Sequence, residues 1–191
     1  MRNDIIDYLQ KEVRKRCESP ANKFGIGIYD HIKAVAKNAE LLAEPLGADK
    51  EAVIIAAWLH DIASITDYSL YKEHHIHGAR MAEEILKSFG YPEGKTKLVC
   101  DCIKNHRGSI VNEKITAEEI CVADADAISH FDSVPSLLFL VFSVRRMEYE
   151  EGVEFVVNKL NRSFAKLSEK SRKFYGEKYR LAMGFLGKSE I

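Results

Sequence analysis

This chain of 191 residues has few of the residues that interrupt helices, with four prolines and 11 glycines. It also lacks any sustained alternation of apolar and polar residues, which is the pattern of a half-buried strand. Few helix breakers and no strand pattern together predict an all-α protein.

An excess of charge of one sign is also missing, because 28 Lys and Arg face 29 Asp and Glu. The overall charge therefore gives no attraction to nucleic acid or to a membrane surface. No segment approaches the roughly 20 apolar residues of a spanning helix, and residues 1–10 lack the apolar stretch of a secretory signal. We expect a cytoplasmic protein without membrane or nucleic-acid partners, and the sequence leaves homo-oligomerisation open.

The four cysteines do not form the spacing of a disulfide framework or of a zinc ribbon. Cys100 and Cys102 are separated by one residue, where such motifs have two. Reduced thiols agree with a cytoplasmic location.

Apolar residues recur at helical spacing nearly throughout the chain. We expect a single domain over residues 1–191, in which a motif core at about 28–130 is followed by a packed helical extension at 136–191. The helices predicted outside the centre of the core cover residues 4–17, 28–46, 74–89, 94–106, 137–147, 153–167 and 172–186.

The segment Ala52–Leu59 is apolar on every side, which predicts a central helix. His60 and Asp61 follow at its end, so two ionisable side chains are expected to be partly buried on this helix. Burying them is costly unless something compensates both. A divalent metal ion does so, because it binds a neutral imidazole and a carboxylate directly.

Adjacent ligands on one helix cannot complete a metal shell, so other segments must contribute. His31 is the best further histidine, because it lies beside the apolar stripe of its helix. A later aspartate must close the shell, and both Asp124 and Asp126 remain candidates. Further candidate ligands are His74, His75, His77 and His106.

The ordered set of these residues resembles the HD superfamily of metal-dependent phosphohydrolases, whose motif runs His, then His-Asp, then Asp over several helices. The resemblance covers roughly residues 28–130 and implies an HD-type helical bundle. The segments that carry it are Asp30–Lys33, Trp58–Ile62 and Val122–Ala127.

The resemblance implies a metal site formed by His31, His60, Asp61 and a late aspartate. Asp126 is favoured because the family's last ligand typically follows an alanine in an Ala-Asp-Arg-like context. Asp124 also follows an alanine, so it stays open.

Some members of the superfamily hold a second ion through two more histidines. The His-x-x-x-Gly-Ala pattern that begins at His74, and His106 further on, match these positions; His75 and His77 stay open as alternatives to His74. The resemblance then implies one or two divalent ions (Mn, Fe, Ni, Zn, Co or Mg), with Asp61 bridging them and an activated hydroxide as nucleophile. Asp61, His74 and His106 are the predicted catalytic residues, the histidines serving as proton donors if no second ion binds.

Substrate contacts cannot be carried over from the better-defined subgroups. Ser64 stands where many catalytic members have lysine, and Ala34 stands where one subgroup has arginine. Lys33, Lys104 and Arg107 are the predicted substrate-binding residues, because they lie close to the ligands in sequence and can pair with phosphate.

Two other features were given no role in the site. Residues 159–191 hold nine Lys or Arg against three Glu, which we interpret as a solvated helix face. His130 has no counterpart in the motif, so replacing it is expected to leave metal binding and hydrolysis intact.

The predicted function is a metal-dependent phosphohydrolase acting on a small phosphorylated molecule, with a nucleotide favoured. Phosphatase, phosphodiesterase and pyrophosphohydrolase activity all stay open. The alternative is a non-catalytic HD sensor that binds a nucleotide or a metal in the same pocket.

Overall fold

The computed structural model describes residues 1–107 and 114–187, and within these ranges it contains helices and no strands. The prediction of an all-α fold is thus confirmed. The α-helices are α1 (Asn3–Cys17), α2 (Gly27–Leu46), α3 (Lys50–Leu59), α4 (Ile62–Thr66), α5 (His74–Ser88), α6 (Glu93–Asn105), α7 (Ala117–Asp132), α8 (Val134–Leu138), α9 (Tyr149–Ala165) and α10 (Glu169–Phe185). A 3-10 helix, η1 (Tyr68–Glu73), precedes α5, and a π-helix, η2 (Phe139–Val144), follows α8.

Local signals in the sequence set several helix ends. The carboxylate of Asp49 accepts a hydrogen bond from the Ala52 amide at 3.0 Å and caps α3. Thr116 and Glu119 form the reciprocal capping box at the start of α7. Gly47 ends α2 at φ 72°, a conformation that glycine adopts without strain.

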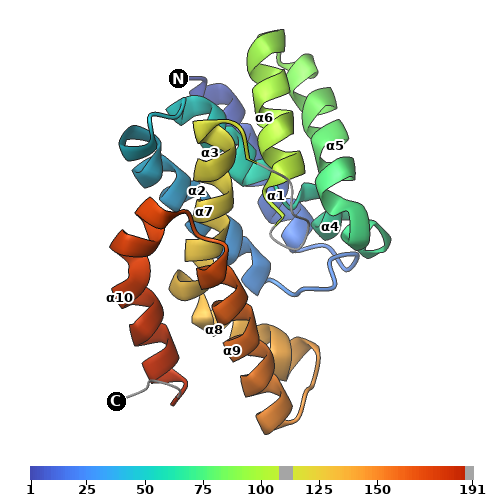
Figure 1. Cartoon of the computed structure of the whole chain (residues 1–191). Coiled ribbons are helices and arrows are strands. Elements are labelled where there is room, and N and C mark those ends of the chain that lie inside the picture. The colour runs from blue at the N-terminus through green and yellow to red at the C-terminus, as the bar shows by residue number, and fades with distance from the viewer. Residues whose placement is uncertain (108–113, 188–191) are drawn as a thin grey trace.

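Helix α3 lies at the centre of the molecule, and every side chain from Ala52 to Leu59 is buried. It packs against α1, α2, α6 and α7, while α2 and α7 also lie along each other. Figure 1 shows α5 and α6 side by side at one end of the bundle and α9 and α10 at the other. Helices α2 and α7 run between these two ends and connect them.

The helix that begins at Lys50 ends before His60 and Asp61, although one continuous helix is predicted to carry both residues. Helix α3 ends at Leu59 and α4 begins at Ile62, and Asp61 has φ −107° and ψ 11°, outside the helical range. The two residues therefore occupy a junction between helices. This corrects the prediction that they share one helix at an angle of about 100°.

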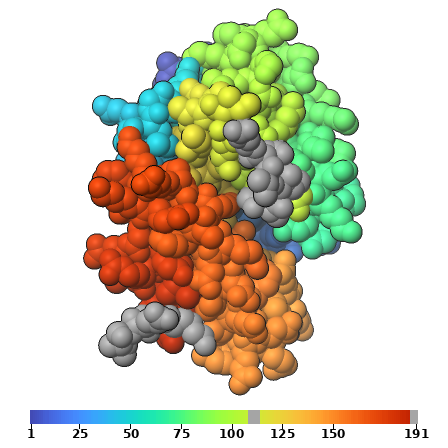
Figure 2. All heavy atoms as spheres, in the orientation of Figure 1, coloured from blue at the N-terminus to red at the C-terminus, as the bar shows by residue number. Residues whose placement is uncertain are grey.

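Helices α9 and α10 pack against α7, as the space-filling view also shows (Figure 2). The buried face of α9 consists of Gly152, Val156, Leu160 and Ser163. Gly152 permits a close approach to η2, because a Cβ atom there would lie 2.5 Å from the Phe142 ring. The extension thus covers one side of α7 and brings the inner face of α9 toward the core.

Among residues 1–107 and 114–187, no single helix has both the length and the apolar composition needed to cross a membrane. The bent pair of α7 with residues 134–144, at 75°, meets the two criteria only when taken together.

Candidate metal centre

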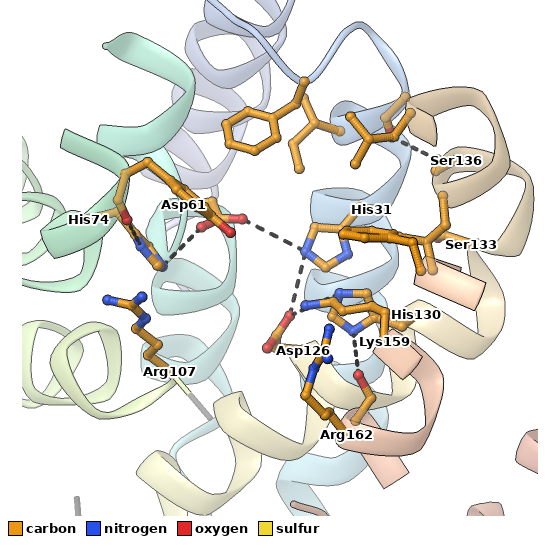
Figure 3. Close-up of a pocket in the computed structure, with 18 of the residues that line it drawn as sticks. His31, Asp61, His74, Arg107, Asp126, His130, Ser133, Ser136, Lys159 and Arg162 are labelled. Atoms are coloured by element: carbon orange, nitrogen blue, oxygen red, sulfur yellow. Dashed lines mark hydrogen bonds and ion pairs between the residues drawn. The ribbon is translucent and has the colours of Figure 1, made fainter. Parts of the chain in front are cut away.

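The carboxylate of Asp61 lies between two groups of imidazoles (Figure 3). Its Oδ2 atom is 3.4 Å from Nε2 of His60 and 3.9 Å from Nε2 of His31. Its Oδ1 atom is 3.4 Å from Nε2 of His74. Each oxygen therefore faces a different set of nitrogen atoms, which is the arrangement that a bridging carboxylate needs.

His106, which directly follows α6, completes the second group with its Nε2 atom 3.2 Å from that of His74. The Nδ1 atoms of these two rings lie 2.8 Å from the Tyr71 carbonyl and 2.6 Å from the Ile103 carbonyl. A carbonyl only accepts, so both Nδ1 atoms carry the proton and both Nε2 atoms present lone pairs when the rings are neutral. A cation bound by Asp61, His74 and His106 would satisfy both lone pairs.

Asp126, and not Asp124, completes the first group of candidate ligands, in which His31 and His60 face Asp61. The Oδ1 atom of Asp126 is 3.5 Å from Nε2 of His31, and its Oδ2 atom pairs with Lys166 Nζ at 2.6 Å. Both oxygens of Asp124 accept hydrogen bonds from Ser168, from its amide at 3.0 Å and from its hydroxyl at 2.5 Å. Two residues along a helix turn the side chain by about 200°, so only one of these aspartates can face the cluster.

The first group of imidazoles is also held in the orientation that exposes Nε2. His31 donates from Nδ1 to the Ser129 hydroxyl at 2.9 Å, and that hydroxyl donates to the Asp126 carbonyl at 2.6 Å. His60 donates from Nδ1 to the Ala57 carbonyl at 2.7 Å. Such outer hydrogen bonds are the usual support of metal-binding histidines.

The cluster fits a divalent metal ion on a further observation. The Nε2 atom of His60 is buried and has no hydrogen-bond partner, a costly state for a polar atom. His31, His60 and Asp61 are close enough together to bind one ion. A mixed imidazole and carboxylate set suits Mn, Fe, Ni, Zn or Co.

Burial and charge place most of these side chains in the protonation states that bind metal; His60 is the exception, because Asp61 outweighs burial there and raises the pKa of the imidazole. Although burial opposes it, the neighbouring His60 keeps the pKa of Asp61 well below its usual range, and Lys166 does the same for Asp126. Burial lowers the pKa of His31 to about 4 and that of His106 to about 3. Near neutral pH both carboxylates are ionised and both of these rings are neutral.

The free energy of unfolding of the metal-free protein should fall as the pH is lowered from 7 to 5, before its carboxylates take up protons. Unfolded histidine takes up a proton near pH 6.5, whereas folded His31 and His106 do so near 4 and 3. Between these values the unfolded state binds more protons, so the free energy of unfolding falls as the pH falls. Thermal melts in EDTA between pH 7 and 5 should show this slope, and His106→Gln should reduce it. Equal slopes for the two proteins would contradict the burial effect on His106.

Of the three neighbouring histidines near the start of α5, only His74 reaches Asp61. His75 is buried but does not line the cavity beside the cluster, and His77 faces Glu73 at 3.9 Å. The alternatives to His74 are therefore placed away from the other candidate ligands.

His130 lies beside the cluster and lines the same cavity, although no role was predicted for it from the sequence. Its Nε2 atom is 4.0 Å from Asp126 Oδ1, its Nδ1 atom is 3.2 Å from the Ser163 hydroxyl, and its ring centre is 4.8 Å from that of His31. The signal was its position four residues after Asp126, since residues at that spacing share a helix face. His130 therefore lies beside the cluster although it has no counterpart in the motif, and the expectation that replacing it leaves metal binding and hydrolysis intact stays a prediction.

A cavity of about 410 Å³ includes the cluster, and several basic side chains are among the residues that line it. Of the three predicted substrate-binding residues, only Arg107 lines it. Lys33 and Lys104 lie outside it, with side chains about half exposed and nearest to Asp30 and Asp101. The cationic residues that line it from the C-terminal extension are Arg145, Lys159, Arg162 and Lys166. Three of these residues, Lys159, Arg162 and Lys166, belong to the basic excess of residues 159–191. Because that excess is interpreted from the sequence as a solvated helix face, the sequence does not predict their place in the cavity.

The helical bundle brings together imidazoles and carboxylates from α2, α5, α7 and the residues that directly follow α3 and α6. This arrangement defines an all-α protein with a His/Asp centre. The family model described as HD domain matches residues 28–130. The chain belongs to the HD domain family. The match has the same limits as the motif core expected from the sequence.

The chain is also similar to ribonuclease Y proteins. It is 31% identical to that of Pseudothermotoga lettingae over 106 residues, which are 56% of this chain and 19% of that protein. It is 30% identical to that of Enterococcus faecalis over 142 residues, which are 74% of this chain and 26% of that protein. The chain thus spans about a fifth to a quarter of the length of these relatives.

Two solved structures share the fold over nearly the whole chain. A predicted HD superfamily hydrolase from an uncultured Thermotogales bacterium has a TM-score of 0.64 at 22% identity, covering 97% of this chain and 89% of that one. YpgQ of Bacillus subtilis, in complex with ADP, has a TM-score of 0.67 at 16% identity, covering 95% and 94%. At these identities the likeness shows the fold alone.

Proposed function

We propose that this protein is a metal-dependent phosphohydrolase that cleaves a phosphate ester or phosphoanhydride of a small molecule, with a nucleotide as the favoured substrate. One observation carries the proposal. The two oxygens of Asp61 face separate imidazole groups in a cavity that several Lys and Arg side chains also line. Metal ligands and phosphate-binding cations thus line a single space.

Each side chain of the cluster has a distinct task in this proposal. His31, His60, Asp61 and Asp126 would hold one ion, while His74 and His106 would hold a second with Asp61 or donate protons to the leaving group. When bound, divalent ions lower the pKa of a water molecule and neutralise phosphate oxygens during an in-line displacement.

The basic side chains next to the cluster support this division of tasks. Lys166 holds Oδ2 of Asp126, which leaves Oδ1 directed toward His31. Arg107 lines the same cavity, where its guanidinium group can bind phosphate oxygens with two hydrogen bonds.

The shape of the cavity favours a small substrate over a polymer. A volume of about 410 Å³ falls in the range of pockets that enclose one small ligand. The aromatic side chains Phe24, Tyr71 and Phe155 line it and can contact a planar base. The ADP in the YpgQ structure, which shares this fold, supports a nucleotide.

The test is a screen of nucleoside mono-, di- and triphosphates, cyclic nucleotides and simple phosphate esters with Mn²⁺, Fe²⁺, Co²⁺, Ni²⁺, Zn²⁺ and Mg²⁺. We expect turnover of at least one nucleotide that EDTA removes and a divalent ion restores. Tight nucleotide binding without turnover under any of these metals would instead favour the sensor function. A protein that binds neither metal nor phosphate would overturn both.

A further inference from the structure

The cavity beside the metal cluster holds more positive charge than the cluster can balance. Among residues 1–107 and 114–187, five basic side chains line it together with two acidic ones, Asp61 and Asp126. The excess is three positive charges with every histidine neutral, and any bound metal ion would add to it. A site of this charge favours a polyanionic ligand.

Three of these cations form one strip, which we call the basic strip: Lys159, Arg162 and Lys166. They come from α9 and the residue after it, outside the segment 28–130 that matches the family. Spacings of three and four residues place their side chains on one face. Figure 3 shows Lys159 and Arg162 on the same side of the cavity as His130, with Arg107 across from them.

Most of the basic strip lacks a protein anion to pair with. Lys166 is bound to Asp126, but within residues 1–107 and 114–187 neither Lys159 nor Arg162 forms an ion pair. Lys159 is half-buried, and burial, together with the neighbouring Lys166 and Arg162, lowers its pKa, although Asp126 and Asp61 act in the opposite direction. Holding like charges together out of water is unfavourable, so a ligand anion would stabilise this arrangement.

The length of the strip sets the size of the anion. Seven residues of helix extend about 10 Å, and the strip begins at Lys166, which contacts the candidate ligand Asp126. Lys159, at the other end, also acts on Asp126 and Asp61, so a single phosphate at the metal cluster can neutralise only part of the strip's charge. Contact with its whole length requires further phosphates linked to the first.

We propose that the basic strip is a polyphosphate subsite, so that the ligand carries two or more linked phosphates and the bond cleaved is a phosphoanhydride. This inference rests on the proposed function for the position of the reacting phosphate. It predicts that nucleoside di- and triphosphates, or a similar polyphosphate, are better substrates than phosphate monoesters and diesters.

Calorimetric titration of the purified protein with inorganic tripolyphosphate and with orthophosphate tests the subsite directly. Wild type should bind tripolyphosphate at least about tenfold more tightly. Lys159→Gln and Arg162→Gln should each weaken tripolyphosphate about tenfold, the loss expected for a hydrogen bond to a charged group, and change orthophosphate less than threefold. Arg162 is exposed, so this variant should keep the fold, which circular dichroism and melting will check.

Lys173→Gln is the matched control, because it removes the same charge from an exposed position on α10 outside the cavity. It should leave both affinities unchanged. Equal losses for the two anions, no loss in the strip variants, or the same loss in Lys173→Gln would overturn the subsite.

Turnover separates this inference from the proposed function. Strip-dependent binding of tripolyphosphate without hydrolysis of any phosphate compound would retain the subsite and reject the hydrolase. Metal-dependent hydrolysis that prefers monoesters and is unaffected by Arg162→Gln would retain the hydrolase and reject the subsite.

Discussion

Asp61→Asn should lose its bound metal and lower kcat/KM by about a hundred- to a thousandfold, the effect typical of removing one group that stabilises transition-state charge. The carboxylate uses both oxygens, one toward His31 and His60 and the other toward His74. An amide has nearly the same shape but no charge, and only one of its two terminal atoms can bind a cation. The substitution therefore weakens both groups at once.

Elemental analysis and steady-state kinetics with the best substrate of the screen measure this effect. Asp101→Asn is the control, because Asp101 lies on α6 and pairs with Lys97 at 2.5 Å outside the cavity. It should keep both metal and activity. An Asp61→Asn protein with wild-type metal content and turnover would end the proposed mechanism.

Asp126→Ala and Asp124→Ala should have different effects on metal content, activity and stability, although the residues are two positions apart. Asp126→Ala removes an oxygen that faces His31 and leaves Lys166 without its partner. We expect metal content to fall and kcat/KM to drop about a hundredfold or more. Metal content and activity should be measured at a pH where both proteins are folded.

Asp124→Ala should instead keep metal and activity but lose stability. Both Asp124 oxygens bind Ser168 just before α10, and losing hydrogen bonds to a charged group costs about 1.5–3 kcal/mol. Urea unfolding measures this loss, and no comparable effect on kcat/KM is expected. If Asp124→Ala lost metal while Asp126→Ala retained it, the assignment of the late aspartate would be reversed.

The sequence could predict the helices and the candidate cluster because both depend on local patterns. Apolar stripes at helical spacing mark the buried faces, and His31 and Asp126 lie on such faces. The break after Leu59 was missed, because the apolar pattern continues through Ile62 and Ile65 without a glycine or proline. Local propensity therefore carries no signal of the point where this helix ends.

Substrate-binding side chains were harder to predict, since closeness in sequence differs from closeness in space. Lys33 is two residues after His31 on α2, and Lys104 is two residues before His106. Two residues turn a helical side chain by about 200°, which directs each lysine away from the cavity. Arg162 and Lys159 could be placed only once the packing of α9 against α7 was known.

The imidazole and carboxylate side chains of the cavity and most of its basic side chains come from two separate stretches of the chain. The histidines and aspartates of the cavity lie within residues 31–130, and most of its Lys and Arg residues lie after residue 144. Under the proposed function, replacing Lys159 or Arg162 should change which molecule is accepted, whereas replacing Lys166 would also release Asp126. In evolutionary terms, the same chemistry can be redirected to new compounds by varying a helix that the shared family core does not include.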